Sequence, residues 1–149
     1  MNENPELPGG RPAGDVYDWY HRGVALLDEG NAAAAAQVLS HARAAAPDSR
    51  MVCEALGRAL YGAGRYAEAA ESFAWIIEID PTDDYAQFGL GLSATKTGEY
   101  GRAVEHLQMA NVLRPQPHYT RALRRASLLR DASKQSREQH REQHREPGA

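Results

Sequence analysis

Cysteine, aromatic residues and long apolar runs are all scarce in this chain of 149 residues. Cys53 is the only cysteine, so no disulfide can form within the chain, which fits a reducing compartment such as the cytoplasm. The longest clearly apolar stretch, residues 73–77, is far shorter than the roughly 20 residues that a membrane helix needs. Residues 1–15 contain no apolar core of a secretory signal. We therefore expect a cytoplasmic protein with no membrane partner.

Catalytic and metal-binding motifs are also missing. The sequence contains no glycine-rich phosphate loop, nucleophile elbow or H-E-x-x-H motif. His140 and His144 are four residues apart and would share one helical face, but they have no third ligand nearby in the sequence. Cys53 stands at a position that we expect to be buried, where a thiol packs as a small apolar group. We expect neither an enzyme nor a metal ion or other cofactor.

What the chain does contain is a period of 34 residues, shared by four kinds of landmark. Each kind occurs three times at that spacing, and the four sets are Pro47, Pro81, Pro115; Gly23, Gly57, Gly91; Gly30, Gly64, Gly98; and Ala35, Ala69, Ala103. A period in this range is typical of a stacked array of small structural units. We therefore divide residues 16–117 into units 16–49, 50–83 and 84–117.

Each unit is predicted to be a pair of helices. The first unit gives helices over 16–29 and 32–46, the second over 50–62 and 66–79, and the third over 84–97 and 101–113. Gly30 and its two equivalents end the first helix of each pair, because glycine adopts a left-handed conformation without steric cost. Gly57 and its equivalents lie inside helices at a cost of about 1 kcal/mol each, so we expect a neighbouring helix to pass too close for a side chain.

The two ends of the chain differ from the units. Residues 1–15 are rich in proline and glycine and are expected to be a disordered leader, ending at Asp15 as an N-cap. An apolar face over 119–129 predicts a seventh helix, at about 117–133, that caps the last unit of a domain spanning 16–133. Residues 134–149 form a charged, low-complexity segment that we expect to be frayed or disordered.

The repeat landmarks resemble the tetratricopeptide repeat, whose pattern is W-x2-L-G-x2-Y, A-x3-F and P within 34 residues. The matching positions are Trp19, Gly23, Ala35, Leu39 and Pro47 in the first unit, Cys53, Leu56, Gly57, Ala69, Phe73 and Pro81 in the second, and Leu90, Gly91, Ala103, Leu107 and Pro115 in the third. The resemblance implies an all-α, right-handed superhelical stack of helix–turn–helix repeats, an α-solenoid. It also implies a protein that binds other proteins in a concave groove lined by the first helices.

The candidate groove is a stripe of residues on the three first helices. Positions 4, 8 and 11 of each unit are expected to pack inward, which leaves positions 2, 5, 6, 9, 12 and 13 as the opposite face. From this face we select twelve candidate binding residues: Tyr17, Tyr20, His21, Val24, Met51, Glu54, Arg58, Tyr61, Tyr85, Phe88, Leu92 and Lys96. Tyrosine is enriched at interfaces because it combines apolar area with a hydrogen-bonding tip. The aromatic residues therefore predict a groove for a protein or peptide segment, although any one of these rings can equally pack as core.

The residue types at positions 2, 5 and 6 of the stripe indicate which kind of partner to expect. Members of the resembled family that grip a C-terminal carboxylate do so with Lys and Asn at positions 2, 5 and 6, where this chain carries no Lys or Arg. We therefore expect an adaptor or chaperone-like scaffold for a segment with apolar anchors, and not a carboxylate clamp.

Charge leaves two alternatives open. Residues 118–149 carry eight Lys or Arg against four Asp or Glu, whereas residues 1–117 carry nine against sixteen. The arginine-rich seventh helix is a candidate surface for nucleic acid or an acidic partner, but such runs are commonly solvated faces, and we do not favour nucleic acid. A homo-oligomer, formed through the seventh helix or the groove, is the third alternative.

Overall fold

The first helix of the first unit begins after a well-formed cap. In the computed structural model, which describes residues 6–7 and 11–148, α1 (Val16–Asp28) starts at Asp15. The Asp15 carboxylate accepts a hydrogen bond from the Asp18 backbone N–H at 3.0 Å, and the Asp18 carboxylate accepts one from the Asp15 N–H at 3.1 Å. This reciprocal pair satisfies two backbone donors that the helix leaves without partners.

The other six helices follow the predicted periodicity. They are α2 (Ala32–Ala45), α3 (Arg50–Gly62), α4 (Tyr66–Ile79), α5 (Asp84–Lys96), α6 (Tyr100–Leu113) and α7 (Pro117–Gln143). Ser49 caps α3 and Asp83 caps α5, each accepting a hydrogen bond from the backbone three residues ahead. Gly30, Gly64 and Gly98 have φ values of 80°, 77° and 81°, so the left-handed turn between paired helices is present in every unit.

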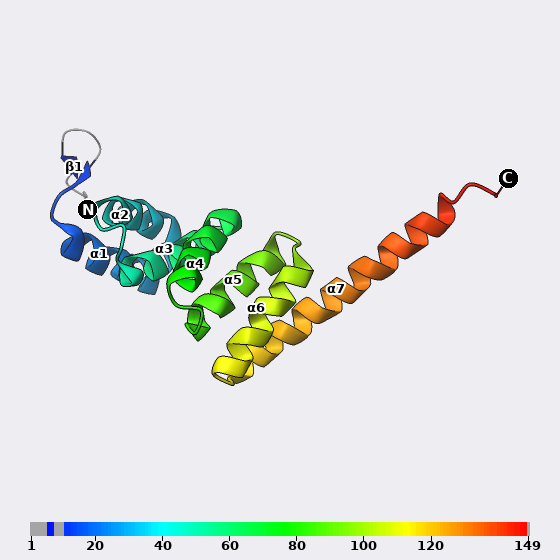
Figure 1. Ribbon diagram of the computed structural model, residues 1–149. Helices are drawn as coiled ribbons and strands as arrows, with labels where there is room; N and C mark the ends of the chain where they lie inside the picture. The colour runs from blue at the N-terminus through cyan, green and yellow to red at the C-terminus, as the bar shows by residue number, and fades with distance from the viewer. Residues whose placement is uncertain (1–5, 8–10, 149) are drawn as a thin grey trace.

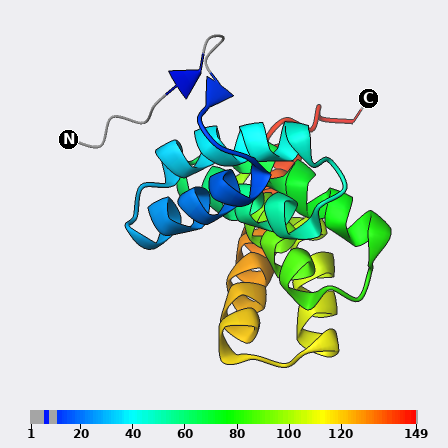
Figure 2. The same ribbon diagram turned by 90° about the vertical axis from the view of Figure 1, so that its left-hand side faces the viewer.

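The helices stack in sequence order as an α-solenoid, which confirms the predicted fold class (Figure 1). Each helix packs chiefly on the helix before it and the helix after it, and α1, α3 and α5 also touch one another in turn. Figure 2 shows α6 and α7 side by side at one end of the array. The N-terminal units lie at the opposite end from the C-terminus, which α7 carries away from the array (Figure 1).

The core consists largely of alanine and leucine between successive helices. Buried side chains include Ala35, Leu39, Cys53, Leu56, Ala69, Phe73, Leu90, Ala103 and Leu107. Cys53 is fully buried as predicted, its Sγ–H donates to the Ser72 carbonyl, and burial raises the pKa of its thiol. Gly57 also has the predicted close neighbour, because a Cβ there would lie 2.9 Å from the Phe73 ring.

The two ends of the chain depart from the sequence-based expectations. In the segment predicted to be a disordered leader, β1 (Glu6–Leu7) pairs antiparallel with β2 (Arg11–Pro12), while residues 1–5 and 8–10 lie outside the described residues. Helix α7 does not end near residue 133 but continues to Gln143. Residues 134–143 are mostly Lys, Arg, Gln and Glu, all of which favour helix, and the first helix breaker is Pro147.

Candidate functional site

A hollow of about 240 Å³ opens between the first helices of the three units. Its walls and floor come from α1, α3, α4 and α5, and the lining residues are Leu27, Arg58, Tyr61, Phe73, Tyr85, Phe88, Gly89 and Leu92. Five of the twelve candidate residues therefore line one feature: Arg58, Tyr61, Tyr85, Phe88 and Leu92. We call this feature the Phe73 hollow, after the ring in its floor.

Phe73 lies in the floor because α3 and α5 both carry glycine where they face it. A Cβ at Gly89 would lie 2.6 Å from the Phe73 ring, and one at Gly57 would lie 2.9 Å from it. The ring of Tyr85 meets Phe73 edge-on with centroids 6.2 Å apart, and Tyr85 lies 6.3 Å from Phe88. Since the rings are held by their packing, the hollow exists without a partner present.

Arg58 brings a positive charge to this aromatic surface. Its side chain is half-buried, and the described residues form no ion pair with it. Burial raises the pKa of Glu54 one turn earlier, Asp83 adds to that rise, and Arg58 and Arg50 oppose it. Burial likewise raises the pKa of Tyr61 and of Tyr85, so both hydroxyls remain protonated donors at neutral pH. The hollow is therefore apolar with one cation and neutral hydrogen-bonding groups.

The remaining candidates lie elsewhere on the first helices. Tyr17, Tyr20 and His21 form a separate group on α1, where the His21 ring is 4.2 Å from Tyr17 and 5.3 Å from Tyr20. Lys96 lies over a ring of α4, with its Nζ 5.7 Å from the centre of the Tyr66 ring. The structure also places Val24 and Tyr20 half-buried against the core, Glu54 half-buried, and Met51 exposed.

The sequence did not predict two features of the candidate site, the part of Phe73 in the hollow and the packing of Phe88 on α7. The sequence marks Phe73 only as a match to the repeat pattern, yet its ring lines the hollow. The available signal was Gly89, which stands where the other units carry His21 and Ala55, and which makes room for that ring. Phe88 was placed on the open stripe, but it also stacks on Tyr119 of α7 with centroids 4.5 Å apart. Phe88 is thus partly a packing residue.

The basic residues of α7 fall into two sets. Arg121, Arg124 and Arg125 are exposed, whereas Arg130, Lys134 and Arg137 line a second cleft against α6. His140 and His144 lie with ring centroids 4.1 Å apart, and among the described residues no group of three or more His, Cys, Asp or Glu is placed to hold a metal ion. The helices in the described ranges include none with the length and apolarity to cross a bilayer.

Comparison with known proteins identifies the repeat. A tetratricopeptide repeat model matches residues 54–118, and the same helix stacking recurs in solved structures. Residues 54–118 thus match the tetratricopeptide repeat, and the chain shares the fold of a protein domain built from it.

Three solved structures show how far the likeness extends. MamA of AMB-1 is 26% identical with a TM-score of 0.67, and the match covers 76% of this chain and 63% of that one. MamA residues 41 to the end from Desulfovibrio magneticus RS-1 is 22% identical with a TM-score of 0.74, covering 89% and 78%. The first tetratricopeptide domain of Spaghetti (RPAP3), bound to an HSP90 peptide, is 15% identical with a TM-score of 0.71, covering 76% and 91%. The last two share only the fold, and this chain spans less than two thirds of the AMB-1 protein.

Proposed function

We propose that this tetratricopeptide repeat protein is an adaptor that binds a segment of a partner protein along α1, α3 and α5. The observation that carries the proposal is the Phe73 hollow, which combines aromatic walls with an unpaired cation. A volume of about 240 Å³ suits one large apolar side chain, and burying such a side chain contributes about 1.5–3 kcal/mol. The partner segment is expected to place an apolar anchor there and an acidic group next to Arg58.

The remaining candidates extend the proposed surface toward the N-terminal unit. Tyr17 is 71% exposed and Met51 is 62% exposed, so both offer apolar area that folding has not buried. Exposed apolar patches of this kind commonly mark contact sites. We place Tyr17, Tyr20, His21, Val24, Met51, Glu54 and Lys96 in the flanking contacts of the same segment.

The chemistry of the groove favours an adaptor over an enzyme or a carboxylate clamp. Positions 2, 5 and 6 of the first helices bring no Lys or Arg to the surface, and the single cation of the hollow comes from position 9. The Spaghetti domain with its HSP90 peptide therefore supports the fold and the general idea of segment binding, without supplying the partner. A cytoplasmic location is part of the proposal and agrees with the single buried thiol of Cys53.

Filling the hollow tests the proposal. Leu92→Arg places a long charged side chain among the rings, whereas Val112→Arg makes the same kind of change at a site that is 77% exposed on α6, outside the hollow. Random peptides displayed on phage would be selected on the wild-type protein and then measured against both variants. We expect binding to fall at least about tenfold for Leu92→Arg, which corresponds to about 1.4 kcal/mol, and to be unchanged for Val112→Arg.

Two outcomes would contradict the groove assignment. One is a set of selected peptides that binds Leu92→Arg as well as the wild type. The other is equal loss in both variants, which would indicate a general charge effect. Circular dichroism of each variant distinguishes lost binding from lost structure.

A further inference from the structure

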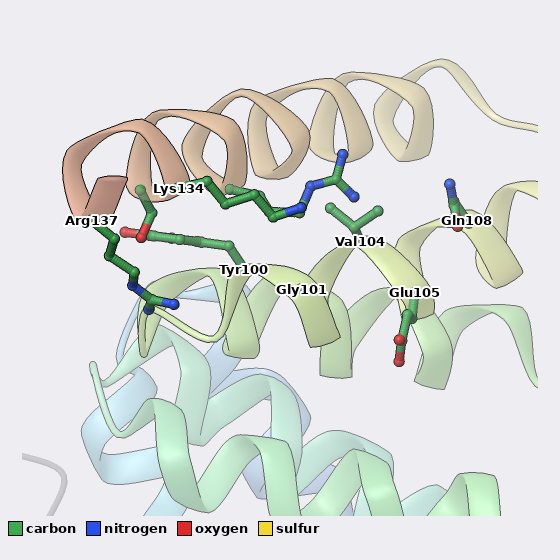
Figure 3. A pocket seen from close by; sticks show the side chains of 10 residues that line it. Tyr100, Gly101, Val104, Glu105, Gln108, Lys134 and Arg137 are labelled. Atoms are coloured by element: carbon green, nitrogen blue, oxygen red, sulfur yellow. The ribbon is translucent and has the colours of Figure 1, made fainter. Parts of the chain in front are cut away.

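A second cleft, of about 380 Å³, lies between α7 and the start of α6. Figure 3 shows Lys134 and Arg137 entering it from α7, with Tyr100 facing them from α6. Arg130, Ser133, Gln108 and Glu105 complete the polar part of its lining. This cleft is separate from the Phe73 hollow, since the two share no residue.

The cleft concentrates positive charge. Arg130, Lys134 and Arg137 follow one another at spacings of four and three residues, which places them on one face of α7. Arg130 pairs with Asp131 at 3.3 Å, but Lys134 and Arg137 form no ion pair within the described ranges. Glu105 also borders the cleft, yet its carboxylate turns away from α7 (Figure 3). Among the lining residues, Lys134 and Arg137 are thus cations that no described carboxylate pairs with.

The opposite wall adds neutral donors. Helix α6 begins at Tyr100, and its N-cap Glu99 gives no side-chain hydrogen bond to the first turn. The backbone N–H groups of Tyr100 and Gly101 therefore have no helical partner, since the first turn of a helix leaves its donors free. A Cβ on Gly101 would meet nothing within 4 Å, so the backbone there is open to a ligand. The Tyr100 hydroxyl supplies one more donor.

This donor set suits a group with several oxygens and more than one negative charge. A phosphoryl group carries a charge of about −1.5 to −2 near neutral pH and three acceptor oxygens, and arginine binds such oxygens in pairs. The positive charge is also local. Beyond Arg137, residues 138–146 alternate Glu138, Arg141, Glu142, Arg145 and Glu146, which leaves no basic track for a long polyanion.

We propose that the cleft between α6 and α7 binds a phosphoryl group, held by Arg130, Lys134 and Arg137 against the first turn of α6. The group is carried either on a phosphorylated side chain or on a small phosphorylated compound, which share this chemistry. The site does not depend on the Phe73 hollow, so failure of either proposal leaves the other standing.

The test is an NMR titration of the full chain at low salt, following backbone amides. The probes are a short peptide with one phosphoserine, the same peptide with glutamate at that position, and inorganic phosphate. We expect saturable shifts at Tyr100 and Gly101 with the phosphorylated probes, and weaker binding of the glutamate peptide. Tighter binding of the phosphopeptide than of inorganic phosphate would assign the source to a side chain, and the reverse would assign it to a small compound.

Matched double variants separate a built site from general attraction. Lys134→Ala with Arg137→Ala removes two charges from the cleft, and Arg121→Ala with Arg124→Ala removes two exposed charges from the same helix outside it. We expect the first pair to weaken binding about tenfold or more, and the second pair to change it less than about twofold.

Three results would overturn the proposal. The first is the absence of shifts at Tyr100 and Gly101 with every probe. The second is an equal loss of affinity in the two double variants, while circular dichroism shows both to be folded. The third is an oligoribonucleotide that binds more tightly than the phosphopeptide and depends equally on Arg121 and Arg124, since this would indicate a nucleic-acid surface.

Discussion

Phe73 sets how closely α3 and α5 approach α4. Its ring occupies the space that a side chain at Gly57 or Gly89 would need. Gly89→Ala gains about 1 kcal/mol of helix propensity but overpacks the core, which typically costs about 1–3 kcal/mol. We therefore expect Gly89→Ala to lower the free energy of unfolding in urea by about 1 kcal/mol. Gly101→Ala, where an added Cβ would meet no group from elsewhere in the fold within 4 Å, should instead stabilise by up to about 1 kcal/mol. Equal stability of Gly89→Ala and wild type would contradict a fixed ring.

His106 gives the fold a dependence on pH. Buried Gln87 donates from its Nε2 to the Pro81 carbonyl at 3.0 Å, so its Oε1 accepts from the His106 Nδ1–H at 2.8 Å. Burial lowers the pKa of His106, the charge of Arg102 lowers it further, and Glu105 opposes the shift. Because the unfolded chain takes up this proton at about pH 6.5 and the folded chain resists it, the stabilising contribution is complete above that pH and is lost as the pH falls toward the folded pKa.

The corresponding measurement compares melting temperatures at about pH 7.5 and about pH 5.5. The wild type should lose more stability on acidification than His106→Asn, whose amide nitrogen can still donate to Gln87 but does not titrate in this range. The difference between the two proteins isolates His106 from the other five histidines. Equal losses in the two proteins would show that His106 is not the titrating group.

At the residue scale, periodicity predicted which positions face outward but not how far a side chain reaches. Arg58, Tyr61, Tyr85 and Leu92 were placed on the stripe because position alone decides the face of a helix. The floor of the hollow depends on a contact between Phe73 and Gly89, which belong to different units. A pattern within one unit does not contain such a contact, so periodicity alone does not predict the hollow, and the one signal for it is the glycine at position 89.

At the scale of elements, α7 combines a packed half and a free half. Tyr119 is buried, its hydroxyl donates to the Asp84 carboxylate at 2.7 Å, and its ring stacks on Phe88. Burial and the Asp84 carboxylate both raise the pKa of Tyr119, so this bond persists well into the alkaline range. Beyond Ser133 the helix is exposed throughout. Helix α7 begins at Pro117 and runs past residue 133 to Gln143, because helix propensity continues where packing stops.

Two truncations test this division of α7. Ending the chain after Ser133 removes only exposed residues and should leave the melting temperature within about 2 °C of wild type. Ending it after Gln116 uncovers Phe88 and removes Tyr119, Ala126 and the Asp84 hydrogen bond, at a cost of at least about 2 kcal/mol. Similar melting temperatures for the two truncations would show that α7 does not stabilise the array.

At the scale of the whole molecule, the fold followed from one number, the 34-residue period. Three copies of the same landmarks require three similar units, and stacking is the way such units bury their apolar faces. The pairing of Glu6–Leu7 with Arg11–Pro12 was not predicted, since two-residue strands leave no alternation to detect. The sequence thus predicts the structure of the units. It does not predict the structure of the two ends, because no repeat covers them.

The position of Phe73 also has a consequence for synthesis. Contacts between neighbouring helices are local in sequence, so the early units can fold while later ones are still being translated. Phe73 follows this order, because its ring contacts Gly89 only when α5 of the next unit has formed. A nascent chain that has completed α4 but not α5 therefore presents this ring to the surroundings. During that interval the nascent chain exposes apolar surface that the finished fold covers.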